Sequence, residues 1–172
     1  MKALIISIGL FLMGFVCIYA SGGRERIRGN DEKITSERTV SSFNKIKTTS
    51  AYKNHNGSDG KGILRIHSSQ EYRVNINIDS NLEQYIEVVN EDTMLKIETK
   101  RKMTDDFVVD IYCPNILGLT IDNRARVEFV DKMITPSLEI NINGAGDIEG
   151  AIECDSFIVN SNGAGFIEIG GT

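Results

Sequence analysis

The last third of this 172-residue chain repeats itself every 19 residues. The repeat is carried by three columns of apolar residues: Leu119, Leu138 and Phe157; Ile121, Ile140 and Val159; and Phe129, Ile148 and Ile167. Between these columns, residues 143–146 (Asn-Gly-Ala-Gly) recur at 162–165, after a degenerate copy at 124–127. A fixed period near 20 residues indicates units that bury their apolar faces only by stacking on one another.

Each unit has the pattern of strands and a corner, with no helical stretch. Residues 138–142 alternate between apolar and polar side chains, and residues 147–149 continue as a second strand after the corner at 143–146. At about 3.3 Å per residue, one circuit of the repeat measures roughly 60 Å, which suits a narrow coil with short faces. The sequence therefore predicts a parallel β-solenoid over residues 119–172.

The residues between the two strands of a unit are predicted to form its corners. Glycine adopts the positive φ of a tight corner without steric cost, and stacked asparagines form ladders of amide hydrogen bonds. We expect such a ladder between Asn143 and Asn162. The predicted structural corner residues are Asn143, Gly144, Gly146, Asn162, Gly163 and Gly165.

The first two thirds of the chain also have a β pattern, but without a regular period. The composition agrees, because 24 Ile stand against 9 Leu and 7 Ala, and turn-forming Asn and Gly number 14 and 16. Strands are predicted at residues 38–46, 63–67, 72–78, 85–89, 94–99 and 107–113. The expected fold class is therefore all-β, with a more irregular β-rich N-terminal half that leads into the parallel coils.

The N-terminus has the pattern of an export signal. Lys2 supplies a positive start, and residues 3–16 form an apolar run that is short for a membrane span of about 20 residues. We therefore expect a signal peptide at residues 1–22, a polar linker at 23–37 and one domain at 38–172. The product would be exported to the periplasm or the outer cell envelope.

Processing of this signal has alternative outcomes. Small residues around Ala20 and Gly22 suit cleavage by a general signal peptidase, whereas Cys17 could become a lipidated N-terminus. The third alternative is an uncleaved membrane anchor. In each case, contact with the membrane runs only through the signal peptide or a lipid anchor.

Little in the sequence indicates catalysis. The formal charge of −5 disfavours nucleic acid as a partner, because phosphate binding requires a cationic face. Residues 144–150 differ from a dinucleotide-binding loop in having no helix pattern after them to hold a pyrophosphate. A calcium-binding repeat is disfavoured because Asp147 aligns with Phe166 in the next unit. We predict no enzyme activity, no catalytic residue, no cofactor and no metal site.

Cys113 and Cys154 are the cysteines outside the export segment. In the predicted register they lie about two coils apart, which at about 4.8 Å per coil exceeds the roughly 7 Å limit between disulfide-bonded Cα atoms. Two reduced thiols are therefore expected.

Several segments together resemble one family of bacterial proteins. They are the opening Arg38-x-Val40-x-x-Phe43-x-x-Ile46, residues 74–82, residues 95–97, the strand end at 111–114 and the Gly-Ala-Gly coils. In this order they are similar to the auto-transporter adhesin, head GIN domain family, over about residues 34–172. The resemblance implies a right-handed, single-stranded β-helix-like fold and an exported, often lipid-anchored protein. Family members usually carry Gly-Ser-Gly in place of Gly-Ala-Gly and commonly have more coils.

The sequence leaves three functional hypotheses. The favoured one is a non-catalytic, adhesin-like binding module for a glycan or another cell-surface or envelope component. The alternative is a purely structural envelope protein that associates with itself through the bare edge at residues 167–172, unless the gene product is shortened relative to its relatives. A polysaccharide-active β-helix enzyme is the least favoured, since no converging acidic residues mark a cleft.

Overall fold

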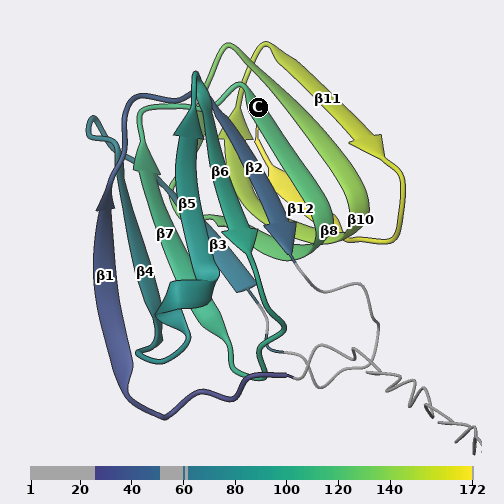
Figure 1. Cartoon of the computed structure of the whole chain (residues 1–172). Helices are drawn as coiled ribbons and strands as arrows, with labels where there is room; N and C mark the ends of the chain where they lie inside the picture. Colours follow the sequence, from purple (N-terminus) through teal and green to yellow (C-terminus); the bar gives the residue numbers. More distant parts are fainter. Residues whose placement is uncertain (1–25, 51–59, 61, 172) are drawn as a thin grey trace, which may run out of the picture.

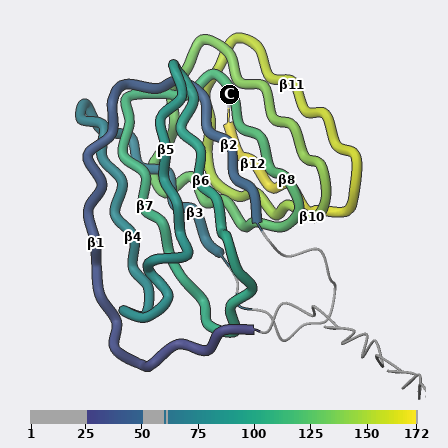
Figure 2. Tube along the Cα trace, viewed as in Figure 1, coloured from purple at the N-terminus to yellow at the C-terminus, as the bar shows by residue number. Residues whose placement is uncertain are grey.

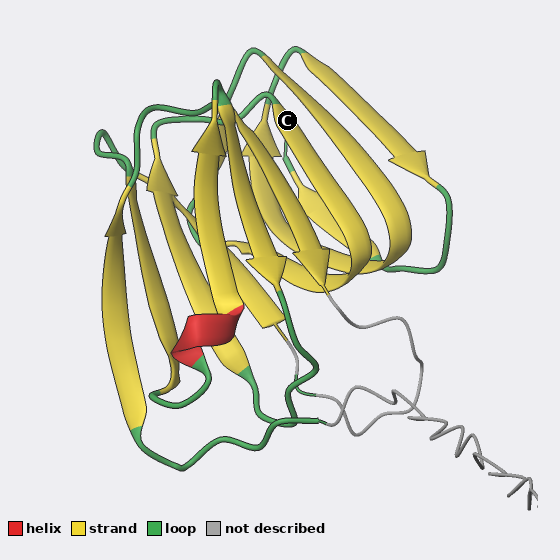
Figure 3. Cartoon of the chain, viewed as in Figure 1, coloured by secondary structure: helices red, strands yellow, loops and turns green. Residues whose placement is uncertain are grey.

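The computed structural model describes residues 26–50, 60 and 62–171, and these residues form an all-β fold, as predicted (Figure 3). The strands are β1 (Lys33–Thr39), β2 (Lys45–Ser50), β3 (Gly62–Ser68), β4 (Arg73–Asp79), β5 (Ile86–Glu91), β6 (Met94–Thr99), β7 (Phe107–Cys113), β8 (Gly118–Phe129), β9 (Met133–Ile134), β10 (Ser137–Glu153), β11 (Ser156–Ser161) and β12 (Ile167–Gly170). One 3-10 turn, η1 (Glu83–Tyr85), precedes β5.

The strands form one sheet that folds over on itself and nearly closes like a barrel. The long strands β8 and β10 bend from one face to the other, so each belongs to both (Figure 2). The first face holds β5, β6 and β2, followed by the first halves of β8 and β10 and then β11. The second holds β1, β4, β7 and β3, followed by the second halves of β8 and β10 and then β12. A single core lies between the two faces.

Five passages of the chain across both faces pair in parallel, and we call each passage a rung. In spatial order the rungs are β6–β7, β2–β3, β8, β10 and β11–β12. The order along the chain differs, because β2–β3 lies between β6–β7 and β8. The N-terminal part is therefore less irregular than expected, since it supplies two of the five rungs.

The spacing of the rungs corrects the predicted columns. Between β10 and β11 the period is 19, since Leu138 pairs with Phe157 as expected. Between β8 and β10 it is 21, because Leu119 pairs with Ile140 and not with Leu138. The predicted columns that begin at Leu119, Ile121 and Phe129 are therefore wrong by two residues at their first step.

The cause is a local insertion of two residues. Val127 pairs with Ile148 at a spacing of 21, whereas Met133 pairs with Ile152 at a spacing of 19. Two extra residues therefore lie between Val127 and Met133. A shift of two keeps every side chain on its own face of a strand, so the apolar pattern does not distinguish the two registers.

The core is built from the inward side chains of all five rungs. Examples from successive rungs of the second face, each at most 1% exposed, are Ile111, Leu64, Val127 and Ile148. These residues alternate with outward polar ones along each strand, as expected for strands with one buried face. The Ile excess of the composition thus fills the core of the bent sheet.

One end of the stack of rungs is closed by antiparallel strands. β4 pairs antiparallel with β7, β1 pairs antiparallel with β4, and β5 pairs antiparallel with β6. β1 begins at Lys33, inside the segment expected to be a polar linker. Its residues are mostly exposed, so pairing with β4 requires few apolar side chains and leaves little signal in the sequence. β11 and β12 form the opposite end (Figure 1).

Candidate functional site

The outward side of the second face carries a row of stacked polar and aromatic side chains. Arg73, Tyr112 and His67 occupy neighbouring positions on β4, β7 and β3, because these strands pair in register. The rings of His67 and Tyr112 stack with centroids 4.5 Å apart, and the guanidinium of Arg73 lies 4.3 Å from the Tyr112 centroid. Such stacking fixes the orientation of all three side chains.

His67 also contacts two carboxylates. Its Nε2 lies 2.8 Å from Oδ1 of Asp110, within hydrogen-bond distance. Its Nδ1 lies 4.0 Å from Oδ2 of Asp131. The side chains of His67 and Asp110 are about one-fifth exposed, so the pair is accessible from solvent.

A column of three carboxylates crosses the same face. Glu128, Glu149 and Glu168 stand in register on β8, β10 and β12, one strand spacing apart. Arg126 bridges the first two, at 3.0 Å from Glu128 and 2.7 Å from Glu149. The hydrogen bond that Arg126 donates to Glu149 raises the pKa of Arg126. Arg65 lies 3.4 Å from Glu128 on the other side.

A groove of about 600 Å³ joins the His67 row to the carboxylate column. Its lining includes Arg65, His67, Glu128, Glu149 and Glu168, with the half-exposed Val130 at its side. The side chain of Glu168 makes no ion pair or hydrogen bond to another described residue. The groove thus offers hydrogen-bond donors, acceptors and an apolar contact, and its volume lies within the usual range of small-ligand sites.

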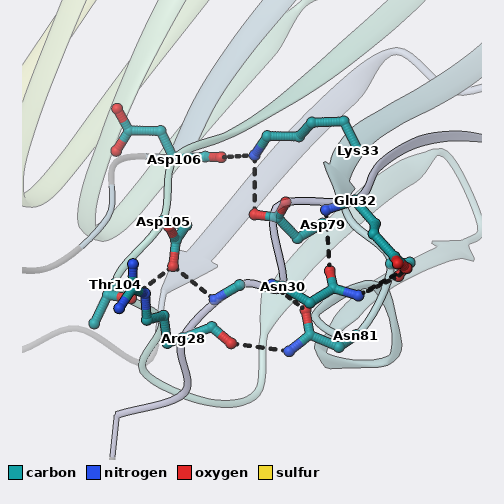
Figure 4. A network of polar contacts seen from close by, with 11 residues as sticks. Arg28, Asn30, Glu32, Lys33, Asp79, Asn81, Thr104, Asp105 and Asp106 are labelled. Atoms are coloured by element: carbon teal, nitrogen blue, oxygen red, sulfur yellow. Dashed lines mark hydrogen bonds and ion pairs between the residues drawn. The ribbon is translucent and has the colours of Figure 1, made fainter.

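A second polar cluster holds the N-terminal segment against the end of the stack (Figure 4). The side chain of Asn81 donates to the carbonyl of Arg28 at 2.8 Å, and the backbone N–H of Gly29 donates to Asp105 at 2.7 Å. Lys33 donates to the buried Asp79 at 3.0 Å. We call residues 27–33, with the loops at 79–81 and 102–106, the N-terminal clasp.

The clasp joins its groups to one another and does not present them to a ligand. Ile27 adds a parallel bridge to Met103, with backbone hydrogen bonds to both neighbours of Met103. A Cβ on Gly29 would overlap the Asp79 carboxylate, so the backbone passes directly over this group. The clasp is therefore best understood as an attachment of the N-terminal segment.

The predicted corner residues lie where β10 and the following rung turn from one face to the other. Gly144 has a φ of +146°, as expected for a corner, and its partner in β8 is Asn123 with a φ of +75°. Ala164 donates to the carbonyl of Gly144, which stacks Gly163 over the same corner. A Cβ on Gly163 or Gly165 would overlap the carbonyl oxygen of Gly144 or Gly146, so close backbone approach selects glycine at both.

The asparagines of the corners pair differently from the expectation. Asn143 donates to Asp122 at 3.0 Å, and burial, which raises the pKa of Asp122, is outweighed by hydrogen bonds from Lys47 and Asn143, which lower it. The amide ladder in the structure joins Asn160 to Asn141, at 3.0 Å. The N–H of Asn162 instead donates to the carbonyl of Ile142.

Cys113 and Cys154 are both free thiols. Their rungs are three strand spacings apart, or roughly 14 Å, which is too far for a disulfide. Burial raises the pKa of the Cys113 thiol to about 12. The proposed lipidation site Cys17 and the cleavage region near Ala20 and Gly22 lie outside the described residues. Within the described residues, no helix is long and apolar enough to span a membrane.

Sequence reasoning missed the groove residues for a topological reason. His67 and Asp110 meet because β3 and β7 pair in parallel across 43 positions of sequence, with β4, β5 and β6 between them. The sequence signal that was available is the alternation of apolar and polar residues. Arg65 and His67 alternate with Leu64 and Ile66, so their side chains are expected to point outward. Alternation places a residue on a face but does not name the neighbouring strand.

Known proteins provide an independent comparison. Residues 58–172 match the family described as "Putative auto-transporter adhesin, head GIN domain". A putative adhesin from Bacteroides fragilis has a similar fold, with a TM-score of 0.67 and 22% identity, over 82% of this chain and 63% of that one. No curated protein matches the sequence.

Two further crystal structures share the fold. A putative adhesin from Parabacteroides merdae has a TM-score of 0.61 and 20% identity, over 79% of this chain and 55% of its own. A putative lipid binding protein from Parabacteroides distasonis has a TM-score of 0.59 and 18% identity, over 84% of this chain and 63% of its own. The chain thus spans less than two thirds of the length of these three proteins.

Proposed function

The chain belongs to the family described as "Putative auto-transporter adhesin, head GIN domain", and we propose that it is an exported, non-catalytic binding protein of the cell envelope. Its rungs would form a short right-handed parallel β-solenoid whose outer face binds the ligand. The parallel pairing of five rungs supports this description. The proposed ligand is a glycan or another hydroxyl-rich component of a cell surface.

The single observation that carries this proposal is the groove between the His67 row and the carboxylate column. A sugar hydroxyl both donates and accepts a hydrogen bond, so it pairs with a carboxylate and with a cationic or imidazole N–H in turn. Glu149 and Glu168 supply acceptors there, and Arg65 and His67 supply donors. Val130, half exposed beside them, suits the apolar face of a sugar ring.

The proposal also includes export through residues 1–22. Cleavage near Ala20 or Gly22 would release the domain, whereas lipidation of Cys17 would attach it to a membrane. In both cases the residues that precede the N-terminal clasp join the domain at the clasp. The mass of the mature N-terminal peptide distinguishes the two products. Lipidation adds the mass of the lipid to Cys17, whereas cleavage near Ala20 or Gly22 leaves an unmodified N-terminal residue.

The experiment is a glycan array with the full chain, followed by titration of each glycan that binds. Glu168→Gln removes one acceptor from the groove and should weaken binding by about tenfold or more, because hydrogen bonds to charged groups contribute roughly 1.5–3 kcal/mol. The matched control is Glu87→Gln on the opposite face, which should bind as the unsubstituted chain does. Equal binding by both variants would contradict the groove as the site.

A second candidate function is favoured by a different observation. All six residues of β11 are exposed, including Phe157, Ile158 and Val159, which suits a structural envelope protein that associates with itself. The third hypothesis, a polysaccharide-active enzyme, has only the His67–Asp110 pair to support it. Hydrolysis of a glycosidic bond requires two converging carboxyl groups in the usual mechanism, and Arg126 holds Glu128 and Glu149 as an ion-paired column.

A further inference from the structure

The edge strands at the two ends of the stack differ in how many charged side chains they carry. β1 and β5 are the edges of the closed end, and both carry charged side chains, among them Lys33, Arg38 and Glu87. Charged side chains on an edge strand prevent another chain from pairing with it. β11 (Ser-Phe-Ile-Val-Asn-Ser) carries no charged residue and no proline. It therefore lacks the usual protection against pairing.

Among the described residues, the core is also open to solvent at β11. Phe157 occupies the position next to Leu138 in the stack, yet it is 44% exposed where Leu138 is 1% exposed. A cavity of about 210 Å³ opens at this end, lined by Ile152, Cys154, Phe157, Ile169 and Gly171. Apolar surface and backbone groups without a partner among the described residues thus coincide at β11.

We propose that β11 pairs antiparallel with β11 of a second copy of this chain. Two identical uncharged strands meet in such a pair, and a two-fold axis closes the contact after two copies. Head-to-tail stacking is disfavoured, because it would place β11 against the charged edges β5 or β1. The pair would continue the first face from one copy into the next and cover the apolar end of both cores.

The alternation of side chains between the two faces of a strand limits the possible registers of this pair. Directly opposite residues in an antiparallel pair point to the same face of the sheet, so their positions in the two identical strands differ by an even number. One residue at the centre of the pair therefore lies opposite the same residue of the second copy. With Ile158 at this position, Phe157 lies opposite Val159 of the second copy, and every central pair is apolar. With Val159 at this position, Ile158 would lie opposite Asn160. The first register is therefore favoured, since it gives aromatic and β-branched cross-strand pairs.

The proposal rests on the second candidate function, self-association through β11, and stands without the binding function. Loss of glycan binding would leave the oligomeric state unchanged, and a monomer could still bind through its groove. The two proposals therefore fail separately.

The first experiment measures the mass of the full chain by sedimentation or light scattering from about 1 to 100 μM, a range around a micromolar dissociation constant. We expect a dimer at the upper end, Phe157→Lys to remain a monomer there, and the control Ile134→Lys to behave as the unsubstituted chain. Ile134 is the right control because it is 63% exposed and lies on β9, away from β11. All three proteins share one N-terminal segment, so a difference between them reports on β11.

The second experiment uses a conservative change that tests the register directly. Ile158→Cys would place two cysteines opposite each other, at a Cα separation near 5 Å that suits a disulfide. Mild oxidation should crosslink most of this variant into a covalent dimer, and little of the unsubstituted chain or of Ile134→Cys. A monomer at 100 μM, a dimer that survives Phe157→Lys, or equal crosslinking of Ile158→Cys and Ile134→Cys would each overturn the proposal. A monomer that retains bound lipid in the cavity would overturn it as well.

Discussion

The two ends of this molecule differ in whether other strands cover the last parallel rung of the sheet. At the closed end, antiparallel strands, charged edges and the N-terminal clasp cover the last parallel rung. At the other end, β11 and β12 continue the repeat without any covering element among the described residues. A parallel repeat is easily extended by one more copy of itself, but a capped end requires strands of a different kind. The comparison therefore sets an end that antiparallel strands cover against an end that no described residue covers.

The largest expected difference between the ends lies in their contribution to stability. Ile76 on β4 is fully buried, whereas Ile158 on β11 is 51% exposed. Ile76→Ala should lower the free energy of unfolding by about 3 kcal/mol, from lost burial and a new cavity, and Ile158→Ala by less than about 0.5 kcal/mol. Urea unfolding at low protein concentration, where β11 is unpaired, measures both. Equal losses would mean that the two ends are covered alike.

The corners give a smaller difference. Gly144 has a φ of +146° and its Cβ would overlap the backbone of Asn123, whereas a Cβ on Gly170 would have its nearest neighbour at 4.0 Å. Gly144→Ala should therefore cost about 2 kcal/mol, and Gly170→Ala should cost little. Thermal unfolding of the two variants compares the corner with the edge. A Gly144→Ala variant as stable as the unsubstituted chain would show that this corner relaxes freely.

The clasp should contribute less than the core but more than a surface ion pair. Lys33 is 53% exposed while its partner Asp79 is 2% exposed, so Lys33→Met leaves a buried carboxylate with less compensation. We expect a loss of about 1–2 kcal/mol, discounted for the solvent that reaches Lys33. Lys132→Met is the matched control, since Lys132 and Glu153 are both about half exposed and their pair should contribute below about 0.5 kcal/mol. Similar losses of unfolding free energy in both variants would show that the Lys33–Asp79 pair contributes no more than an ordinary surface ion pair.

The smallest expected effect is a pH dependence of the clasp. Hydrogen bonds from the Thr104 hydroxyl and the Gly29 N–H hold the pKa of Asp105 below its usual 3.8. A carboxyl with a lowered folded-state pKa stabilises the fold above its unfolded pKa, and this contribution is lost as the pH falls through the folded value. Asp105→Asn should therefore reduce the drop in stability between pH 6 and pH 3, and Thr104→Val should reduce it partly. An unchanged pH profile in both variants would exclude this role for Asp105.

The same comparison shows which parts of the structure could be predicted from the sequence. The open end follows a local repeat, so the pairing of Leu138 with Phe157 and the positive φ of Gly144 were predictable from spacing and residue type. The first step of the repeat was misjudged, because an insertion of two residues preserves the alternation of faces. Asn123 could have been recognised, since asparagine tolerates positive φ better than most residues.

The closed end and the groove depend on contacts that sequence patterns do not encode. The insertion of β2–β3 between β6–β7 and β8 joins segments about 50 residues apart in the chain, as in the pairing of Ile46 with Leu95. Any strand with the same alternation would satisfy the pattern equally well. The His67–Asp110 pair is a consequence of that order, so it could not be found before the order was known. The clasp is polar apart from Ile27 and Met103, so it leaves no apolar period in the sequence.

Amide hydrogen exchange at low protein concentration compares the closed and the open end most directly, because it measures the protection of every rung in one experiment. The structure places β2 and β3 in the interior of the stack, with a strand on each side, and β11 at its uncovered edge. We predict that amides of β2 and β3 exchange only through global unfolding, whereas those of β11 exchange through local opening and are orders of magnitude faster. Fast exchange in β2 and β3, or protection of β11 in the monomer equal to that of β4, would contradict this account of a closed and an open end.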